Sequence, residues 1–159
     1  VKTTDAVLTA THFTATTQTE LFTIVGCIAV KMLYIELTSA ADANATVVKY
    51  RATFTTPVIA VADMCGNSGS IANLAAHRKI VWVGGAVATA AVLTASAGIN
   101  DVEAAGKLHI LGGETADGTN TVGTIGMLAS TASQAATITA TAHLFYIGLS
   151  DGAYAEALL

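Results

Sequence analysis

The chain has 159 residues, the length of one ordinary domain. Only 11% of them are charged, against about a quarter in a typical soluble protein. A net charge of −4 and sparse basic residues argue against a nucleic-acid partner, because no basic footprint is present to neutralise phosphates. Such low charge is typical of a membrane protein, an aggregation-prone protein or one covered by partner subunits. The long uncharged stretch 80–100 contains Gly84, Gly85 and several hydroxyl residues, which favours covered subunit surfaces over a membrane helix.

The first 20 residues differ in composition from the rest of the chain. They are rich in Thr and contain few large apolar side chains. Such a segment is typical of an N-terminal arm, or an edge strand, that becomes ordered by lying on a neighbour. We therefore expect residues 1–20 to form this arm or edge strand, and residues 21–159 to form a single β domain.

Side chains that alternate with a period of two predict strands through most of the domain. In residues 47–54, one face is apolar and the other carries charged and hydroxyl side chains. The apolar face consists of Val48, Tyr50, Ala52 and Phe54. Further strands are predicted at Leu21–Val25, Ala29–Thr38, Val58–Ala62, Lys79–Val83, Ala88–Ala95, Lys107–Leu111, Gly123–Leu128 and Ala153–Leu158.

The longest alternating run is residues 137–149. Its first face is apolar throughout and consists of Ile138, Ala140, Ala142, Leu144 and Tyr146. The second face begins with threonines and a histidine and then becomes apolar, at Phe145, Ile147 and Leu149. This change predicts a strand that passes from solvent into a covered region.

Turn sequences rich in Gly, Asn and Asp separate these runs. Strands at such short, regular spacing predict an all-β sandwich, jelly roll or barrel of about 8–10 short antiparallel strands with an extended N-terminal arm. One segment, Ser70–Arg78, is predicted to form a helical turn with Ser70 as its cap.

A glycine-rich loop offers the one candidate nucleophile. The sequence Cys65-Gly66-Asn67-Ser68-Gly69 is similar to the nucleophile loop of chymotrypsin-like serine proteases. The chain before it is too short to form the barrel that carries the base, and its single histidine, His12, lies in the predicted arm. A small hydrolase centred on Ser68 is therefore an alternative, and a strand-to-helix turn is the preferred interpretation.

No other cluster of polar residues predicts a catalytic, cofactor or metal site. The four histidines are far apart and have no ligand spacing: His12, His77, His109 and His143. Glu114, Asp117 and Asn120 share a loop that could hold calcium, but a turn stabilised by its own side chains explains them more simply. We therefore expect a protein that is not an enzyme and has no cofactor.

The cysteines and the aromatic residues leave two alternatives open. Cys27, in an apolar run, is predicted to be a buried small hydrophobe, and a disulfide between Cys27 and Cys65 is the alternative. Aromatic side chains serve either in packing or in lining a sugar site. They are Trp82, Tyr34, Tyr50, Tyr146 and Tyr154.

The C-terminal sequence Ala140-Thr141-Ala142-His143-Leu144-Phe145-Tyr146-Ile147-Gly148-Leu149-Ser150-Asp151-Gly152-Ala153 resembles the closing strand and turn of small virion structural proteins of tailed phages, with Gly148 where a proline often stands. The segments 20–24 and 30–37 resemble the opening strands of the same group. The resemblance implies a β-rich capsid decoration (cement) protein in the virion, assembled in the host cytoplasm, which contacts the major capsid protein or other virion subunits. It also implies a homo-oligomer, with a trimer favoured.

These expectations assign no nucleic-acid and no membrane partner. The candidate interface residues are Thr11, Phe13, Thr16, Phe145, Ile147 and Leu149. The alternative function is a carbohydrate- or receptor-binding β module of a tail or head fibre, which requires an exposed cluster of aromatic side chains.

Overall fold

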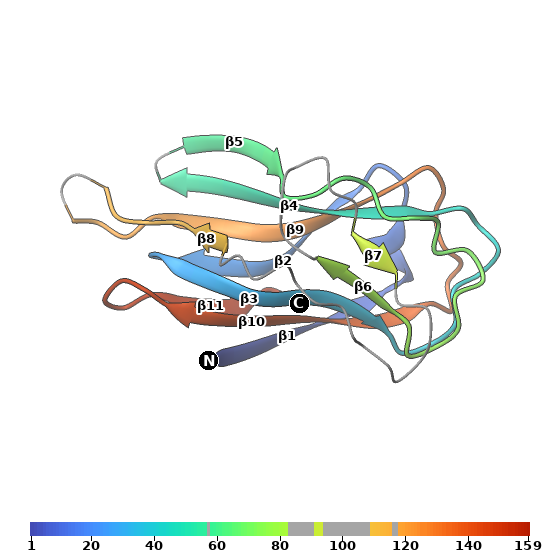
Figure 1. The fold of residues 1–159 in the computed structure, drawn as a ribbon. Helices are drawn as coiled ribbons and strands as arrows, with labels where there is room; N and C mark the ends of the chain where they lie inside the picture. Colours follow the sequence, from blue (N-terminus) through green and yellow to red (C-terminus); the bar gives the residue numbers. More distant parts are fainter. Residues whose placement is uncertain (57, 83–90, 94–108, 116–117) are drawn as a thin grey trace.

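The computed structural model describes residues 1–56, 58–82, 91–93, 109–115 and 118–159. Two antiparallel sheets pack face to face in an open sandwich (Figure 1). This arrangement confirms the predicted all-β class and excludes a closed barrel. In the described ranges, no helix has the length and apolarity needed to cross a bilayer.

Sheet A has β1 at one edge and follows the order β1-β10-β3-β6-β7, while β8 pairs with β3 beyond the end of β6. Its strands are β1 (Lys2–Thr9), β3 (Ile28–Leu37), β6 (Lys79–Trp82), β7 (Val92–Leu93), β8 (His109–Leu111) and β10 (Thr139–Gly148). Sheet B follows the order β11-β2-β9-β4-β5. Its strands are β2 (Gln18–Val25), β4 (Val47–Thr56), β5 (Val58–Asp63), β9 (Val122–Ser130) and β11 (Tyr154–Ala157).

The core lies between the sheets and is formed by the alternating faces that the sequence predicts. On β4, the whole predicted apolar face is buried, from Val48 to Phe54. On β10 and the residue before it, the even-numbered side chains from Ile138 to Tyr146 are buried. Because a strand turns alternate side chains to opposite faces, these patterns determine which side of each strand packs inward.

The N-terminal segment belongs to the sandwich. β1 pairs with β10 over its full length and forms the edge of sheet A, which is the second of the two forms expected for residues 1–20. Ala6, Leu8 and Phe13 are fully buried, so an extended arm held only by a neighbour is not what the chain forms. The boundary expected at residue 20 falls inside β2.

The helical turn predicted at Ser70–Arg78 is wrong. The segment forms two successive turns, in which Asn73 and His77 have φ of +58° and +66°. A residue in the left-handed region interrupts a right-handed helix, and here this happens twice within five residues. The predicted strand 88–95 is described only at residues 91–93, where it contains β7, and the predicted strand 107–111 is described from His109 onward.

Buried aromatic side chains connect the two sheets through hydrogen bonds. The Tyr50 hydroxyl on β4 donates to the carbonyl of Ile80 on β6, at 2.6 Å. The Tyr146 hydroxyl on β10 donates to the carbonyl of Ala155 on β11, at 3.0 Å. Trp82 Nε1 at the end of β6 donates to the carbonyl of Met64, which directly follows β5, at 3.1 Å. The three bonds satisfy polar groups that the core shields from water.

Candidate interaction surface

The outer face of sheet A carries an apolar patch, which we define as Met32, Ile110, Phe145 and Ile147. In the sheet register, Phe145 lies opposite Met32, while Ile147 and Ile110 lie on either side of Ala29. Opposed residues of an antiparallel pair point to the same face, so the four side chains lie together. Ile110 is 61% exposed, Met32 41% and Ile147 36%.

An aromatic and charged group continues this face toward the middle of the sheet. The ring centroid of Tyr34 lies 4.7 Å from that of His143 and 6.1 Å from that of Phe145. His143 Nδ1 lies 2.7 Å from a carboxylate oxygen of Asp5 on β1, and Lys79 Nζ lies 5.4 Å from the Tyr34 ring centroid. The outer face thus changes along β10 from threonines and a histidine to apolar side chains.

The protonation state of Tyr34 follows from its surroundings. Partial burial raises the pKa of Tyr34, and the negative charges of Glu36 and Asp5 raise it further. The phenol therefore remains neutral near pH 7. A neutral ring beneath an ammonium group and beside an imidazole is suited to stacking and hydrogen bonding, and not to acid–base catalysis near neutral pH.

Three of the predicted interface residues lie at this end of the sheet. Phe145 and Ile147 belong to the apolar patch, and Leu149, just beyond β10, is half exposed. A groove of about 510 Å³ opens beside them. It is lined by Val1, Lys2, Tyr146, Ile147, Gly148, Ser150, Gly152, Ala153 and Tyr154.

The other three predicted interface residues lie at the opposite end of β1. Thr11 is exposed in the short 3-10 helix Ala10–Phe13, and Thr16 is exposed in the turn after it. Phe13 is fully buried, because the 3-10 turn directs its ring into the protein's own core. Phe13 is therefore removed from the candidate interface, and the six residues do not form one patch.

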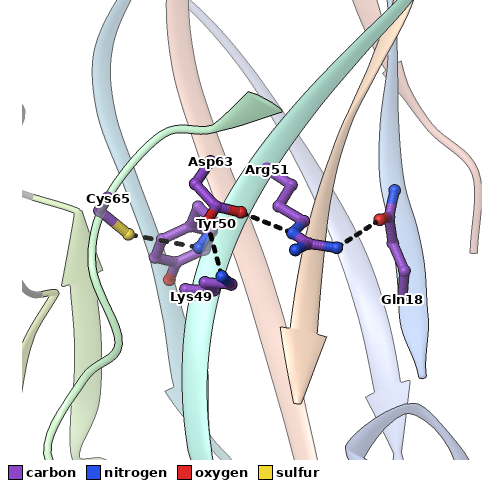
Figure 2. Close-up of polar contacts among 6 residues, drawn as sticks. All are labelled: Gln18, Lys49, Tyr50, Arg51, Asp63 and Cys65. Atoms are coloured by element: carbon purple, nitrogen blue, oxygen red, sulfur yellow. Dashed lines mark hydrogen bonds and ion pairs between the residues drawn. The ribbon is translucent and has the colours of Figure 1, made fainter. Parts of the chain in front are cut away.

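The outer face of sheet B carries a compact polar cluster (Figure 2). Asp63 on β5 accepts hydrogen bonds from Lys49 at 2.6 Å and from Arg51 at 2.7 Å, both on β4. Arg51 also donates to the side-chain carbonyl of Gln18 on β2, at 3.2 Å. Burial would raise the pKa of Asp63, but the hydrogen bonds from Lys49 and Arg51 outweigh it and lower that pKa. Ionised and fully paired, this carboxylate ties the edge strand β5 to the sheet.

Ser68 does not have the surroundings of a nucleophile. It is buried, its hydroxyl donates to the carbonyl of Gly69 at 2.7 Å, and the same oxygen accepts the backbone N–H of Val48 at 3.0 Å. Both roles of the hydroxyl are thus used by main-chain groups. The glycine-rich loop serves here to hold the chain after β5 against the start of β4.

The candidate metal ligands remain dispersed. Within the described ranges, no three His, Cys, Asp or Glu side chains gather closely enough to hold an ion. Glu114 and Asn120 form an isolated bridge, and Asn120 Nδ2 donates to the carbonyl of Asp151 at 3.2 Å. Asp117, the third member of the calcium alternative, lies outside the described residues.

The two cysteines are free thiols, and no disulfide joins them. Cys65 is buried, and its Sγ accepts the backbone N–H of Tyr50 at 3.3 Å (Figure 2). Burial, the largest cause, raises the pKa of Cys65. Cys27 is only half buried, so its prediction as a buried hydrophobe is wrong: it lies in the turn between β2 and β3, at the end of the sandwich.

Most of the aromatic side chains are used inside the sandwich. Trp82, Tyr50 and Tyr146 are buried and bonded to the opposite sheet. They are therefore unable to line an exposed sugar site. Tyr154 at the groove and the half-buried Tyr34 are the tyrosines that reach the surface.

The pairing of Asp5 with His143 is a feature of this surface that the sequence does not predict. The two residues are separated by 138 positions, and the composition around Asp5 predicts only an arm or an edge strand. Alternation places His143 on the outward face of its strand, but nothing local identifies β1 as the neighbour. A comparison of the chain with protein-family models, with curated proteins and with solved structures finds no match in any of the three.

Proposed function

We propose that this chain is a structural subunit that acts by contact with other subunits, as a capsid decoration (cement) protein of the tailed-phage kind. The observation that carries the proposal is the apolar patch on the outer face of sheet A, which consists of Met32, Ile110, Phe145 and Ile147. Exposed apolar patches of this kind mark protein–protein contacts. The patch includes part of the C-terminal segment that resembles virion structural proteins.

The low charge of the chain supports the same proposal. Stable interfaces have cores that are depleted of charged residues, and a protein that holds a shell together needs contact area, not a reactive group. Three carboxylates, those of Asp5, Glu36 and Asp63, are paired with basic side chains within the chain. The partners in this proposal are the major capsid protein or other virion subunits, together with further copies of the chain in a cyclic oligomer, with a trimer favoured.

The test has two steps. Antibody labelling first identifies the virions that contain the chain. The purified chain is then co-sedimented with shells assembled from the major capsid protein of those virions. Ile147→Asp inserts a charge into the patch and should weaken shell binding by at least about tenfold. The matched control is Val58→Asp, because Val58 is 87% exposed on the edge of the other sheet. Absence of the chain from virions, or equal losses in the two variants, would refute the proposal.

One observation favours the alternative of a carbohydrate- or receptor-binding module. Tyr34 and Phe145 present two stacked rings beside the charged side chains of Asp5 and Lys79, and sugars bind to such rings through their apolar faces. If this alternative holds, Tyr34→Ala abolishes glycan binding, whereas Ile110→Asp leaves it intact. A glycan array with both variants separates the two functions.

A further inference from the structure

The outer edge of β1 is the longest regular strand edge that the structure leaves open. β1 pairs with β10 at all eight positions from Lys2 to Thr9 without a register shift. Its other side has no partner strand among the described residues, and at its end the Thr9 N–H donates to His12 Nδ1 at 2.9 Å, so the open stretch runs from Lys2 to Leu8. Such an edge presents a row of backbone donors and acceptors that another strand can extend.

The remaining edge strands carry the features that discourage pairing. β7 has two residues, β8 three and β11 four, so none of them offers a long template. β5 is paired irregularly with β4, with a register shift between Ala52 and Phe54, and it ends on the ion-paired Asp63. Short edges, bulges and charges are the usual protections against edge-to-edge association. In β1, the four residues Ala6–Thr9 contain no charge, and the carboxylate of Asp5 is turned toward His143 on the inner neighbour.

We propose that the outer edge of β1 pairs antiparallel with β1 of a second copy of this chain, about a two-fold axis at Val7. An antiparallel strand pair is self-complementary under such an axis, so one sequence supplies both sides of the contact. Opposed residues must share a face of the joined sheet, which limits where the axis can lie.

Charge excludes one position of the axis within that limit, and the exposed Val7 favours another. An axis at Asp5 would set two carboxylates directly opposite each other, which is destabilising. An axis at Val7 sets Asp5 opposite Thr9 of the second copy, and Ala6 opposite its Leu8. It also brings together the two Val7 side chains, each 63% exposed in the single chain. This register covers the exposed valine and keeps the carboxylates apart.

The contact has a definite consequence for assembly. Two copies joined at β1 form one continuous sheet whose outer face carries both apolar patches. A strand pair of this length is weak in dilute solution, because association entropy opposes it, and it strengthens where copies are held side by side. A two-fold contact does not close a three-fold ring, so it would link neighbouring rings. It goes beyond the shell assignment and does not depend on it.

The test is cysteine cross-linking in the Cys27→Ser background, with Cys65 left buried. Val7→Cys places two thiols opposite each other across the axis, where Cβ atoms of paired residues lie about 4.5–5.5 Å apart. We expect oxidation to give disulfide-linked dimers about tenfold faster than in the control Val58→Cys, whose site is also on an edge strand and more exposed. Equal rates in the two variants, or no dimer from Val7→Cys, would overturn the proposal.

Circular dichroism checks that both cysteine variants are folded. Should Val7→Cys fail to fold, sedimentation equilibrium of Val7→Lys against Val58→Lys gives the answer. A lysine on the β1 edge should weaken self-association by about tenfold while the lysine on β5 leaves it unchanged. No difference between the two lysine variants, or a wild-type chain that stays monomeric at the highest soluble concentration, counts against pairing at β1. Neither result changes the antibody labelling of virions, so the proposed shell function is tested independently of pairing at β1.

Discussion

Tyr50→Phe removes one hydroxyl from the centre of the sandwich and leaves the ring in place. The hydroxyl is fully buried and donates at 2.6 Å to the carbonyl of Ile80 on the opposite sheet. Its loss deprives that carbonyl of a partner where water does not reach. Leaving a buried acceptor without its hydrogen bond costs about 1–3 kcal/mol, and we expect about 2 kcal/mol for this site, which corresponds to a fall in Tm of about 4–8 °C in a domain of this length.

Urea unfolding followed by circular dichroism measures the effect. The midpoint should fall while the slope with denaturant concentration stays the same, because the variant exposes the same surface on unfolding. Tyr154→Phe is the matched control: Tyr154 is 40% exposed, and its hydroxyl has no hydrogen bond to the residues that the structure describes. It should change the stability by less than about 0.5 kcal/mol. Equal stability of Tyr50→Phe and the wild type would refute the idea that this bond helps hold the sheets together.

The same residue predicts a change in alkaline stability. Burial raises the pKa of Tyr50 well above 10, and the nearby Cys65 raises it further. The folded chain then retains a proton that the unfolded chain releases, so stability falls as pH rises above the ordinary tyrosine pKa of about 10. Tyr50→Phe lacks this group, and its stability should fall less steeply over that range.

Three further changes test other parts of the structure. Gly112→Ala should lower the stability by several kcal/mol, because φ is +77° and a Cβ would collide with the carbonyl of Gly26. In the control Gly113→Ala the added Cβ contacts nothing, so thermal unfolding should be nearly unchanged. An aromatic disulfide reagent should label Cys27 in the native chain and Cys65 only in denaturant, because Cys65 is buried and its pKa is raised. Equal labelling rates of the two thiols in the native chain would contradict this. Asp63→Asn should cost about 1 kcal/mol at pH 7. The lowered pKa of Asp63 means that its contribution is present above the unfolded pKa and is lost as pH falls through the folded one, so urea midpoints of variant and wild type should converge as pH falls below the ordinary aspartate pKa.

The strands are the most predictable part of the fold. β4 and β10 alternate so regularly that their buried faces can be assigned from the chain alone, and both assignments are confirmed. Burial on one face imposes a period of two, and this period is visible without knowledge of the partner strand. The segment Ser70–Arg78 shows the opposite situation. Its composition suits a helix, but Asn73 and His77 take left-handed conformations that only the surrounding chain selects.

The interaction surface is predictable in part. Phe145 and Ile147 stand out because the outward face of their strand becomes apolar, and both lie in the patch. Met32 and Ile110 complete the patch from β3 and β8. They do not stand out in the sequence, because their side chains become neighbours only once the order of the strands is known.

The all-β character of this protein, and the faces that its strands bury, follow from the sequence by itself, since they depend on the local pattern of side chains along each strand. The open edge of β1, its link from Asp5 to His143 and the burial of Phe13 depend on contacts between segments far apart in the chain. Strand order and register decide these contacts, and they are set by the packing of the whole sandwich, which no short stretch of sequence encodes.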